Sequence, residues 1–127
     1  MNRRAIVLFV LCLTLAPRPA AAEPVTYDCR LVNVQAPEPD RFRGVNQIVI
    51  DDAADTLELK ASGGFYWIFA TREQDMFIVR TLQDGSISGA GTRAGTPSLF
   101  ELSPDRMFRF ANIFADEIRW FEWQCEG

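Results

Sequence analysis

Apolar and polar residues alternate along most of the chain between positions 25 and 125. A repeat of two residues is typical of β-strands that bury one face. The alternation is clearest in the first and last segments, whose apolar faces consist of Val25, Tyr27, Cys29 and Leu31, and of Phe121, Trp123 and Cys125. The pattern predicts an all-β fold and places both cysteines on the apolar faces of the first and last strands.

Short segments separated by turn sequences fill the region between these ends. Turn-forming residues occur at positions 51–55, 83–85 and 103–105. Apolar segments recur about every ten residues, as in a meander of antiparallel strands. The sequence therefore predicts a single β domain over residues 23–127, a small antiparallel meander barrel or sandwich of about seven or eight strands.

Cys29 and Cys125 are the two cysteines outside the N-terminal segment. One intramolecular pairing is open to them, and it would join the first and last strands by a disulfide. Closing a loop of about 100 residues stabilises a fold by ~4–5 kcal/mol on the chain-entropy model. A reactive thiol pair, the alternative, is typical of the short spacing C-x-x-C. The sequence therefore predicts a structural disulfide and an oxidising compartment.

The first 22 residues have the features of a cleaved secretory signal peptide. Arg3 and Arg4 supply a positively charged start, and residues 5–15 form an apolar run. Ala20 and Ala22 supply the small residues that signal peptidase requires. We expect cleavage after Ala22 and a mature chain that is periplasmic or secreted.

A membrane anchor is not expected in this segment. A helix that crosses a bilayer needs ~20 apolar residues, and Pro17 and Pro19 interrupt the run before that length. Cys12 does not fit a lipoprotein cleavage site, because Leu11 precedes it where a small residue is needed. The prediction is a chain without a transmembrane or lipid anchor.

Charge limits the classes of partner. The full sequence has 13 basic and 17 acidic residues, a net charge of −4. Removal of Arg3, Arg4 and Arg18 with the signal peptide would leave ten basic residues against the same 17 acidic ones, a net charge of −7. An acidic domain repels the phosphates of nucleic acids and the surface of anionic membranes. We therefore expect no nucleic-acid binding, and a cationic protein fits best as the unknown partner.

The sequence gives little support for a catalytic or metal-binding motif. The chain has no histidine, which excludes Ser-His-Asp and Cys-His catalysis and histidine-ligated zinc. Asp51, Asp52 and Asp55 lack the spacing of a calcium loop and fit a hairpin turn better. Lys60 and Ser62 share a strand face opposite the apolar one, so the lysine is expected in water and not as a catalytic base. We predict a non-enzyme without catalytic, cofactor-binding or metal-binding residues.

Gly89 and Gly91 lie in a glycine-rich stretch, residues 85–95. The stretch lacks the G-K-[ST] ending of a phosphate-binding loop, and no helix is expected after it. Glycines here indicate either a strand with close backbone packing or a flexible hairpin. Both interpretations are open from the sequence.

Aromatic residues make up 12% of the chain. Most are expected in the core, because a small β domain needs large side chains to fill it. Alternation leaves Trp120 on the face opposite Phe121 and Trp123, and residues 65–67 (F-Y-W) cannot all point inward. The outward aromatics would form a binding patch, line a cavity or lie under a covering loop such as residues 35–46.

Residues 62–66 (S-G-G-F-Y) have the pattern S-G-x-x-Y. The pattern resembles the first signature of the bacterial periplasmic and membrane-bound inhibitors of C-type lysozyme. Residues 27–29 (Y-D-C) are similar to the strand that opens this family, and Cys125 to its late cysteine. The family's second signature, a lysine followed by glycine, is absent, since no lysine follows Lys60. The resemblance implies a small exported β-barrel in which Ser62 and Tyr66 belong to a loop that enters the lysozyme cleft.

Taken together, the residues predict an exported, non-catalytic binding module of unknown partner. The candidate contact residues are Ser62, Gly63, Tyr66 and Trp120. Inhibition of C-type lysozyme is the alternative that the resemblance implies. A further alternative is a lipocalin-like carrier of a small apolar ligand, whose aromatic residues would line a cavity.

Overall fold

The computed structural model describes residues 23–35, 44–62, 64 and 66–126. Every regular element within these ranges is a β-strand, and they contain no helix long and apolar enough to cross a membrane. The predicted signal peptide with its cleavage residues Ala20 and Ala22 lies outside the described residues, as do Gly63 and most of the expected covering loop.

The described part of the chain forms nine strands. They are β1 (Val25–Gln35), β2 (Val45–Asp51), β3 (Thr56–Ala61), β4 (Tyr66–Phe69), β5 (Phe77–Thr81), β6 (Ile87–Arg93), β7 (Thr96–Leu102), β8 (Met107–Ile113) and β9 (Ile118–Glu126). Turns at residues 52–55, 83–85 and 104–105 connect successive strands where the turn sequences predict them. The count is slightly higher than the expected seven or eight, because even the four residues of β4 pair as a separate strand.

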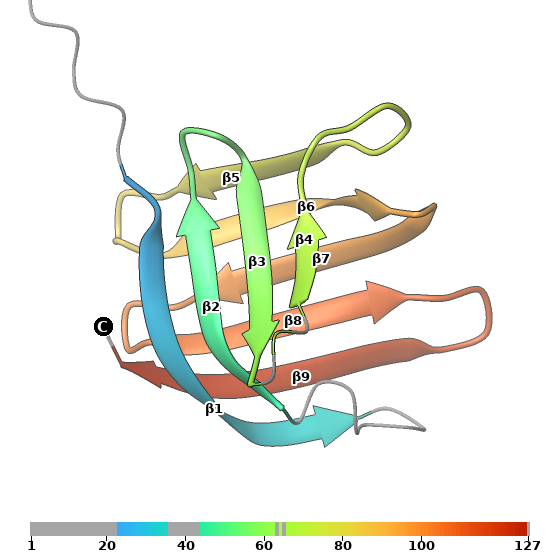
Figure 1. Cartoon of the computed structure of the whole chain (residues 1–127). Coiled ribbons are helices and arrows are strands. Elements are labelled where there is room, and N and C mark those ends of the chain that lie inside the picture. The colour runs from blue at the N-terminus through green and yellow to red at the C-terminus, as the bar shows by residue number, and fades with distance from the viewer. Residues whose placement is uncertain (1–22, 36–43, 63, 65, 127) are drawn as a thin grey trace, which may run out of the picture.

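All nine strands belong to one antiparallel sheet, in the order β4-β3-β2-β1-β9-β8-β7-β6-β5. The first strand pairs with the last, so each half of the sheet is a meander that runs outward from this central pair. In Figure 1 strands β1–β4 lie in front of β5–β9 and cross them at a steep angle. The sheet thereby folds over on itself into a nearly closed barrel, which confirms the predicted all-β fold.

The disulfide lies at the centre of the sheet. Cys29 on β1 and Cys125 on β9 are registered neighbours with Cα atoms 4.0 Å apart, and their sulfur atoms are bonded. Both side chains are buried, as their place on the apolar faces predicts. The expected bond between the first and last strands is confirmed, and it indicates an oxidising environment outside the cytoplasm.

Aromatic rings fill the space between the two layers. Phe69 on β4 reaches across to Phe110 on β8, with ring centroids 5.2 Å apart. Further ring pairs with centroids 5.3–6.1 Å apart extend this contact through the core: Phe69–Phe77, Phe77–Phe100, Phe100–Phe108, Phe108–Trp123 and Phe121–Trp123. Most of the aromatic residues therefore form the core, as expected for a small β domain.

Side chains close the barrel where β3 and β4, at one end of the sheet, approach β5 and β6 at the other. Oδ1 of Asp55 accepts hydrogen bonds from the backbone N–H of Val79 at 2.8 Å and from Nη1 of Arg80 at 3.0 Å. Oγ1 of Thr71 accepts from the N–H of Phe77 and donates to its carbonyl, both at 3.1 Å. We call these contacts the seam. They occupy backbone groups on the outer edge of β5, which would otherwise be open to pairing with another strand.

Replacing Asp55 by glycine is expected to lower the free energy of unfolding by about 1–2 kcal/mol, the low end for a hydrogen bond to a charged group, since the side chain is 34% exposed. The φ angle of Asp55 is 55°, which glycine adopts without strain, so the loss combines the missing carboxylate with the greater freedom of glycine in the unfolded chain. Asp55→Asn keeps an acceptor and tolerates this φ, and should lose less. Urea denaturation compares the three proteins. A glycine variant as stable as the native protein would mean that Asp55 does not hold the seam.

Candidate functional site

Ser62 lies directly after β3, beside the start of β2. Its hydroxyl accepts a hydrogen bond from Nδ2 of Asn46 at 2.9 Å, and its backbone N–H donates to the carbonyl of Gly44 at 3.3 Å. Both Ser62 and Asn46 are exposed. The bond from Asn46 uses one acceptor site of a hydroxyl that has one donor and two acceptor sites, so Ser62 keeps capacity for a partner.

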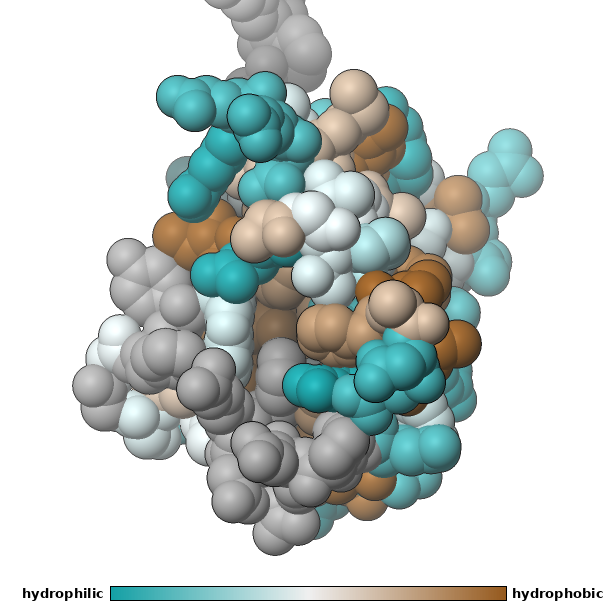
Figure 2. All heavy atoms as spheres, turned by 90° about the vertical axis from the view of Figure 1, so that its right-hand side faces the viewer, coloured by the Kyte–Doolittle hydropathy of each residue, from teal (hydrophilic) through white to brown (hydrophobic). Residues whose placement is uncertain are grey.

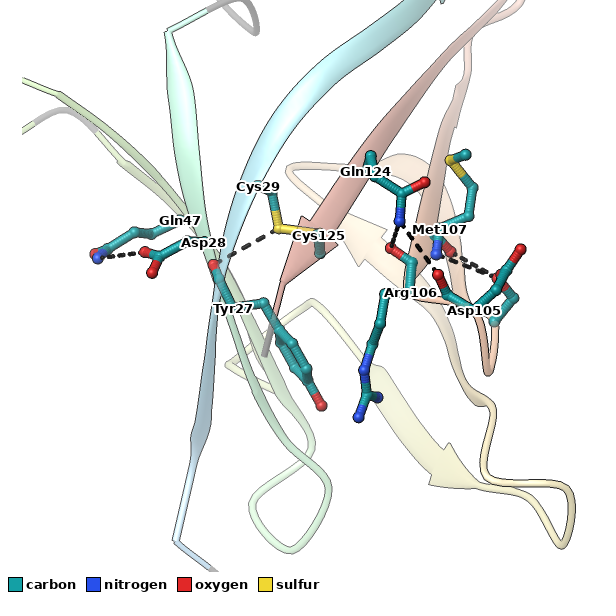
Figure 3. Close-up of a disulfide and its surroundings, with 10 residues drawn as sticks. Tyr27, Asp28, Cys29, Gln47, Asp105, Arg106, Met107, Gln124 and Cys125 are labelled. Carbon is teal, nitrogen blue, oxygen red and sulfur yellow. Dashed lines mark hydrogen bonds between the residues drawn. A yellow bond between two sulfur atoms is a disulfide. The ribbon is translucent and has the colours of Figure 1, made fainter.

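A row of polar side chains crosses the outer face of four strands next to Ser62. In register order the row consists of Lys60 on β3, Gln47 on β2, Asp28 on β1 and Glu126 on β9. Alternation turns these residues outward, because their strand neighbours Leu59 and Cys29 point into the core. Nε2 of Gln47 donates to Oδ1 of Asp28 at 3.2 Å, and Figure 3 shows the two side chains pointing toward each other beside the disulfide.

Asn46 reaches this surface through a break in the strand register. The pairing of β2 with β3 shifts between Val45↔Ala61 and Gln47↔Lys60, which leaves Asn46 as an extra residue. Such a β-bulge redirects a side chain out of the regular alternation. Nothing in the sequence points to Asn46, because the apolar pattern indicates a strand only from residue 47 and the bulge depends on pairing with a different segment.

Three shallow hollows in the surface meet at Asn46. One runs along β1 over residues 30–34, and the second lies against Lys60 on β3 and Ser62 directly after it. The third reaches across β1 to Gln124 on β9, whose Nε2 donates to the carbonyl of residue 105 (Figure 3). We call the outward side chains around these hollows the Asn46 surface, defined by Asp28, Arg30, Asn46, Gln47, Lys60 and Ser62.

Charges of both signs lie on the Asn46 surface. Asp28 and Arg30 are exposed on β1. Nζ of Lys60 is 3.9 Å from Oε2 of Glu58, with the two side chains 44% and 30% exposed. A pair this exposed contributes ~0–1 kcal/mol, so Lys60 can exchange Glu58 for another partner with little loss. Amides, a hydroxyl and charges around shallow hollows suit contact with another macromolecule.

Trp120 lies away from Ser62. It is on the outer face of β9 opposite Gln35 at the far end of β1, and its Nε1 donates to Oε1 of Gln35 at 2.7 Å. Because β2 pairs only with the N-terminal part of β1, the strands next to Ser62, β2 and β3, do not extend to this point. Phe121 and Trp123 are both fully buried, as the alternation predicts. The structure therefore separates candidate contacts that the sequence could not place relative to each other.

The remaining candidates, Gly63 and Tyr66, follow β3 in the chain. Tyr66 is the first residue of β4, and its backbone is the registered neighbour of Lys60 on β3. Gly63 lies outside the described residues. The backbone of Tyr66 thus borders the Asn46 surface on the side away from β1.

Two carboxylates are held in surface turns by serine side chains. The hydroxyl and the backbone N–H of Ser86 donate to Asp84 and lower the pKa of its carboxyl below the ordinary 3.8. The hydroxyl of Ser103 donates to Asp105 and lowers the pKa of that carboxyl in the same way. Hydrogen bonds to the charged form favour ionisation. The shift is opposite to the one that a general acid needs at neutral pH, so both groups act as turn stabilisers.

The acidic turn between β2 and β3 also uses its carboxylates within the fold. Oδ1 of Asp51 accepts from two backbone N–H groups of the turn, both at 3.0 Å, and Oδ2 of Asp52 accepts from the hydroxyl of Thr81 at 2.7 Å. Asp55 belongs to the seam. The predicted hairpin turn is confirmed. In the ranges that the structure describes, no three acidic or cysteine side chains are grouped so that they could hold a metal ion.

Comparison of the chain with protein-family models, curated proteins and solved structures found no match. The resemblance to lysozyme inhibitors therefore rests on the residues quoted above. The function has to be inferred from the geometry of the Asn46 surface and from the charge of the chain.

Proposed function

We propose that this protein is an exported, non-catalytic binding module that contacts a partner protein through the Asn46 surface. The observation that carries the proposal is the meeting of three hollows at Asn46, next to the exposed hydroxyl of Ser62. Such hollows can receive projecting side chains of another protein. The sheet beneath is cross-linked by the disulfide of Cys29 and Cys125, so few groups need to be ordered on binding.

The packing of the interior favours a surface contact over transport of an apolar ligand. A carrier of small molecules needs a cavity of roughly 300–1,000 Å³. In the described core the rings of Phe69, Phe77 and Phe110 meet across the layers at centroid distances of 5.2–5.5 Å. A ligand inside the barrel would have to displace these rings, so the carrier alternative is the less favoured one.

A cationic protein is the partner class that the charge of the chain favours. The net charge is −4, and −7 once the residues of the predicted signal peptide are removed. Opposite charge raises the rate of encounter and disfavours acidic competitors. C-type lysozyme is the named candidate, because Ser62 and Tyr66 carry the resemblance to its inhibitors and Ser62 lies on the Asn46 surface.

Two independent features of the chain support export from the cytoplasm. Residues 1–22 have the charged, apolar and small-residue regions of a signal peptide. The disulfide between Cys29 and Cys125 is typical of an oxidising compartment. Both favour the periplasm or the extracellular space as the place where the partner is met.

A pull-down from envelope extract, with C-type lysozyme added, tests the proposal. The native protein is immobilised beside a Ser62→Arg variant, which places a long charged side chain at the hollows and removes one exposed hydrogen bond. Gln83→Arg is the matched control, because it adds the same charge in an exposed turn after β5. We expect the native protein and the control to retain a partner whose binding Ser62→Arg weakens by at least ~10-fold, or ~1.4 kcal/mol.

The identity of the retained protein decides between the alternatives. Retention of lysozyme in this pattern would support the inhibitor function, and retention of another protein would support a binding module with that partner. A partner held equally by all three proteins would mean that the Asn46 surface is not the contact. Failure of the native protein to retain any partner would contradict the proposed function.

A further inference from the structure

The outer face of β5–β9 carries an apolar surface that the proposed function does not use. Among the described residues, eight large hydrophobic side chains are exposed, and five of them lie on this face. The five are Met76 (63% exposed), Ile118 (59%), Leu99 (46%), Ile78 (41%) and Ile113 (37%). In Figure 2 this face lies along the right-hand margin, where brown residues recur among teal ones. Apolar side chains gathered on one face indicate an interaction surface.

Strand register arranges the face in three rows that run from β5 to β9. The central row consists of Ile78, Ala90, Leu99, Ala111 and Trp120, each paired with the next. On one side lies a second, mostly apolar row of Met76, Thr92, Pro97, Ile113 and Ile118. On the other side lies a polar row of Arg80, Ser88, Glu101, Arg109 and Glu122.

The central row is symmetric in size about β7. Leu99 stands in the middle, an alanine stands on each side of it, and the large side chains of Ile78 and Trp120 stand at the ends. The polar row ends in opposite charges, Arg80 on β5 and Glu122 on β9, each of which also has an ion-pair partner within the chain, Asp55 and Arg109. A face with these two properties is complementary to itself when it is turned about β7.

We propose that this face binds a second copy of the chain in a two-fold symmetric dimer, with the symmetry axis running along β7. The axis places β5 of one copy over β9 of the other, so that alanine meets alanine, Leu99 meets Leu99, and Arg80 meets Glu122. Glu101 meets its own copy near the axis, and its registered neighbour Arg109, which pairs with Glu122 at 3.2 Å, keeps the net charge of the row low. Sheets packed face to face in this way are a standard arrangement of β layers.

The charge of the face favours a second copy over a cationic partner. The chain as a whole has a net charge of −4, whereas the three rows contain two arginines, two glutamates and no other charged residue. Two copies that meet through this surface therefore repel each other less than their net charge suggests. The Asn46 surface lies on β1–β3 and stays accessible in this dimer, so the inference is independent of the proposed function.

The size of the face predicts a reversible dimer. Five strands ~4.8 Å apart and three rows ~7 Å apart give a face of roughly 500 Å² once side-chain widths are included. Stable complexes bury ~800 Å² from each partner, so this interface belongs to the smaller, weaker class. We expect a dimer that forms at high concentration and dissociates on dilution.

Sedimentation velocity of the protein produced from the full-length chain, over about a hundredfold range of concentration, tests this inference. We expect the native mass to rise from monomer to dimer, and Leu99→Arg to weaken the dimer by at least ~10-fold, since two arginines would meet at the axis. Val25→Arg is the matched control: Val25 is 47% exposed against 46% for Leu99, but lies on β1, so this variant should dimerise like the native protein.

A cysteine variant tests the same axis without disrupting it. Leu99→Cys should form a disulfide-linked dimer under mild oxidation, because only a residue near a two-fold axis meets its own copy, and Val25→Cys should not. A native protein that stays monomeric throughout the concentration range would overturn the inference. So would equal behaviour of the Leu99 and Val25 variants in both experiments, which would assign self-association to another surface.

Discussion

Replacing Cys29 and Cys125 together by alanine is expected to lower the free energy of unfolding by about 4 kcal/mol. The two residues are 96 positions apart, and a cross-link that closes a loop of this length restricts the unfolded chain by ~4–5 kcal/mol. A small domain has a total stability of ~5–15 kcal/mol, so the variant would keep only part of its margin. Guanidinium unfolding followed by tryptophan fluorescence measures the loss.

The position of the bond explains why the loss should affect the whole domain. Pairing of β1 with β9 joins the two halves of the described sheet, and the disulfide lies within that pairing. Reductant should bring the native protein to the midpoint of the alanine variant, and the variant itself should not respond to it. A loss below ~1 kcal/mol would mean that the cross-link does not restrict the unfolded chain as the entropy model requires.

Gly91→Ala is expected to destabilise the protein by ~3 kcal/mol or more, or to prevent folding. A Cβ atom at this position would lie 2.0 Å from the carbonyl oxygen of Met76 and 2.7 Å from Cα of Phe77. Both contacts involve backbone atoms, so no side-chain rotation relieves them and β5 would have to move away from β6. The core ring of Phe77 would move with it.

Two other glycines provide graded controls for this prediction. A Cβ atom on Gly89 would lie 2.3 Å from Cε1 of Phe100, a side chain that can partly shift, and 2.9 Å from the carbonyl oxygen of Ile78, a milder backbone contact than at Gly91, so we expect a loss of ~1–3 kcal/mol. A Cβ atom on Gly44 would lie 3.6 Å from Cβ of Ala61, an ordinary contact, so we expect a change within ~0.5 kcal/mol. Urea midpoints compare the three variants. Equal stability of the Gly91 and Gly44 variants would contradict the close approach of β5 to β6.

These glycines also mark a limit of what the sequence predicts. The missing G-K-[ST] ending excluded a phosphate loop, yet a tight strand and a flexible hairpin both fitted residues 85–95. Pairing of β6 with β5 and β7 makes this stretch mostly strand, in which Gly89 and Gly91 face the rings of Phe100 and Phe77. Whether these residues form a strand or a flexible hairpin depended on the neighbouring strands β5 and β7, which lie about ten residues away in the chain on either side.

The candidate contact residues Trp120 and Ser62 also show what the sequence alone could not predict. Alternation predicted that Trp120 points outward, because Phe121 and Trp123 had to fill the core. It could not show that Trp120 continues a row through Ala111 and Leu99, since that row exists only in the register of separate strands. Ser62 was found through its motif, whereas Asn46, its hydrogen-bond partner, had no signal in the chain.

The sequence by itself determined the all-β fold, the inward and outward faces of its strands, the hairpin at residues 52–55 and the partner of each bonded cysteine. These properties follow from local alternation, from turn chemistry and from the presence of one pair of cysteines outside the N-terminal segment. Only the tertiary structure decided the order of the strands, the bulge at Asn46, the seam at Asp55 and the apolar rows on β5–β9. Each of these depends on the register between segments distant in the chain, and the periodicity of a single strand carries no information about its register with another.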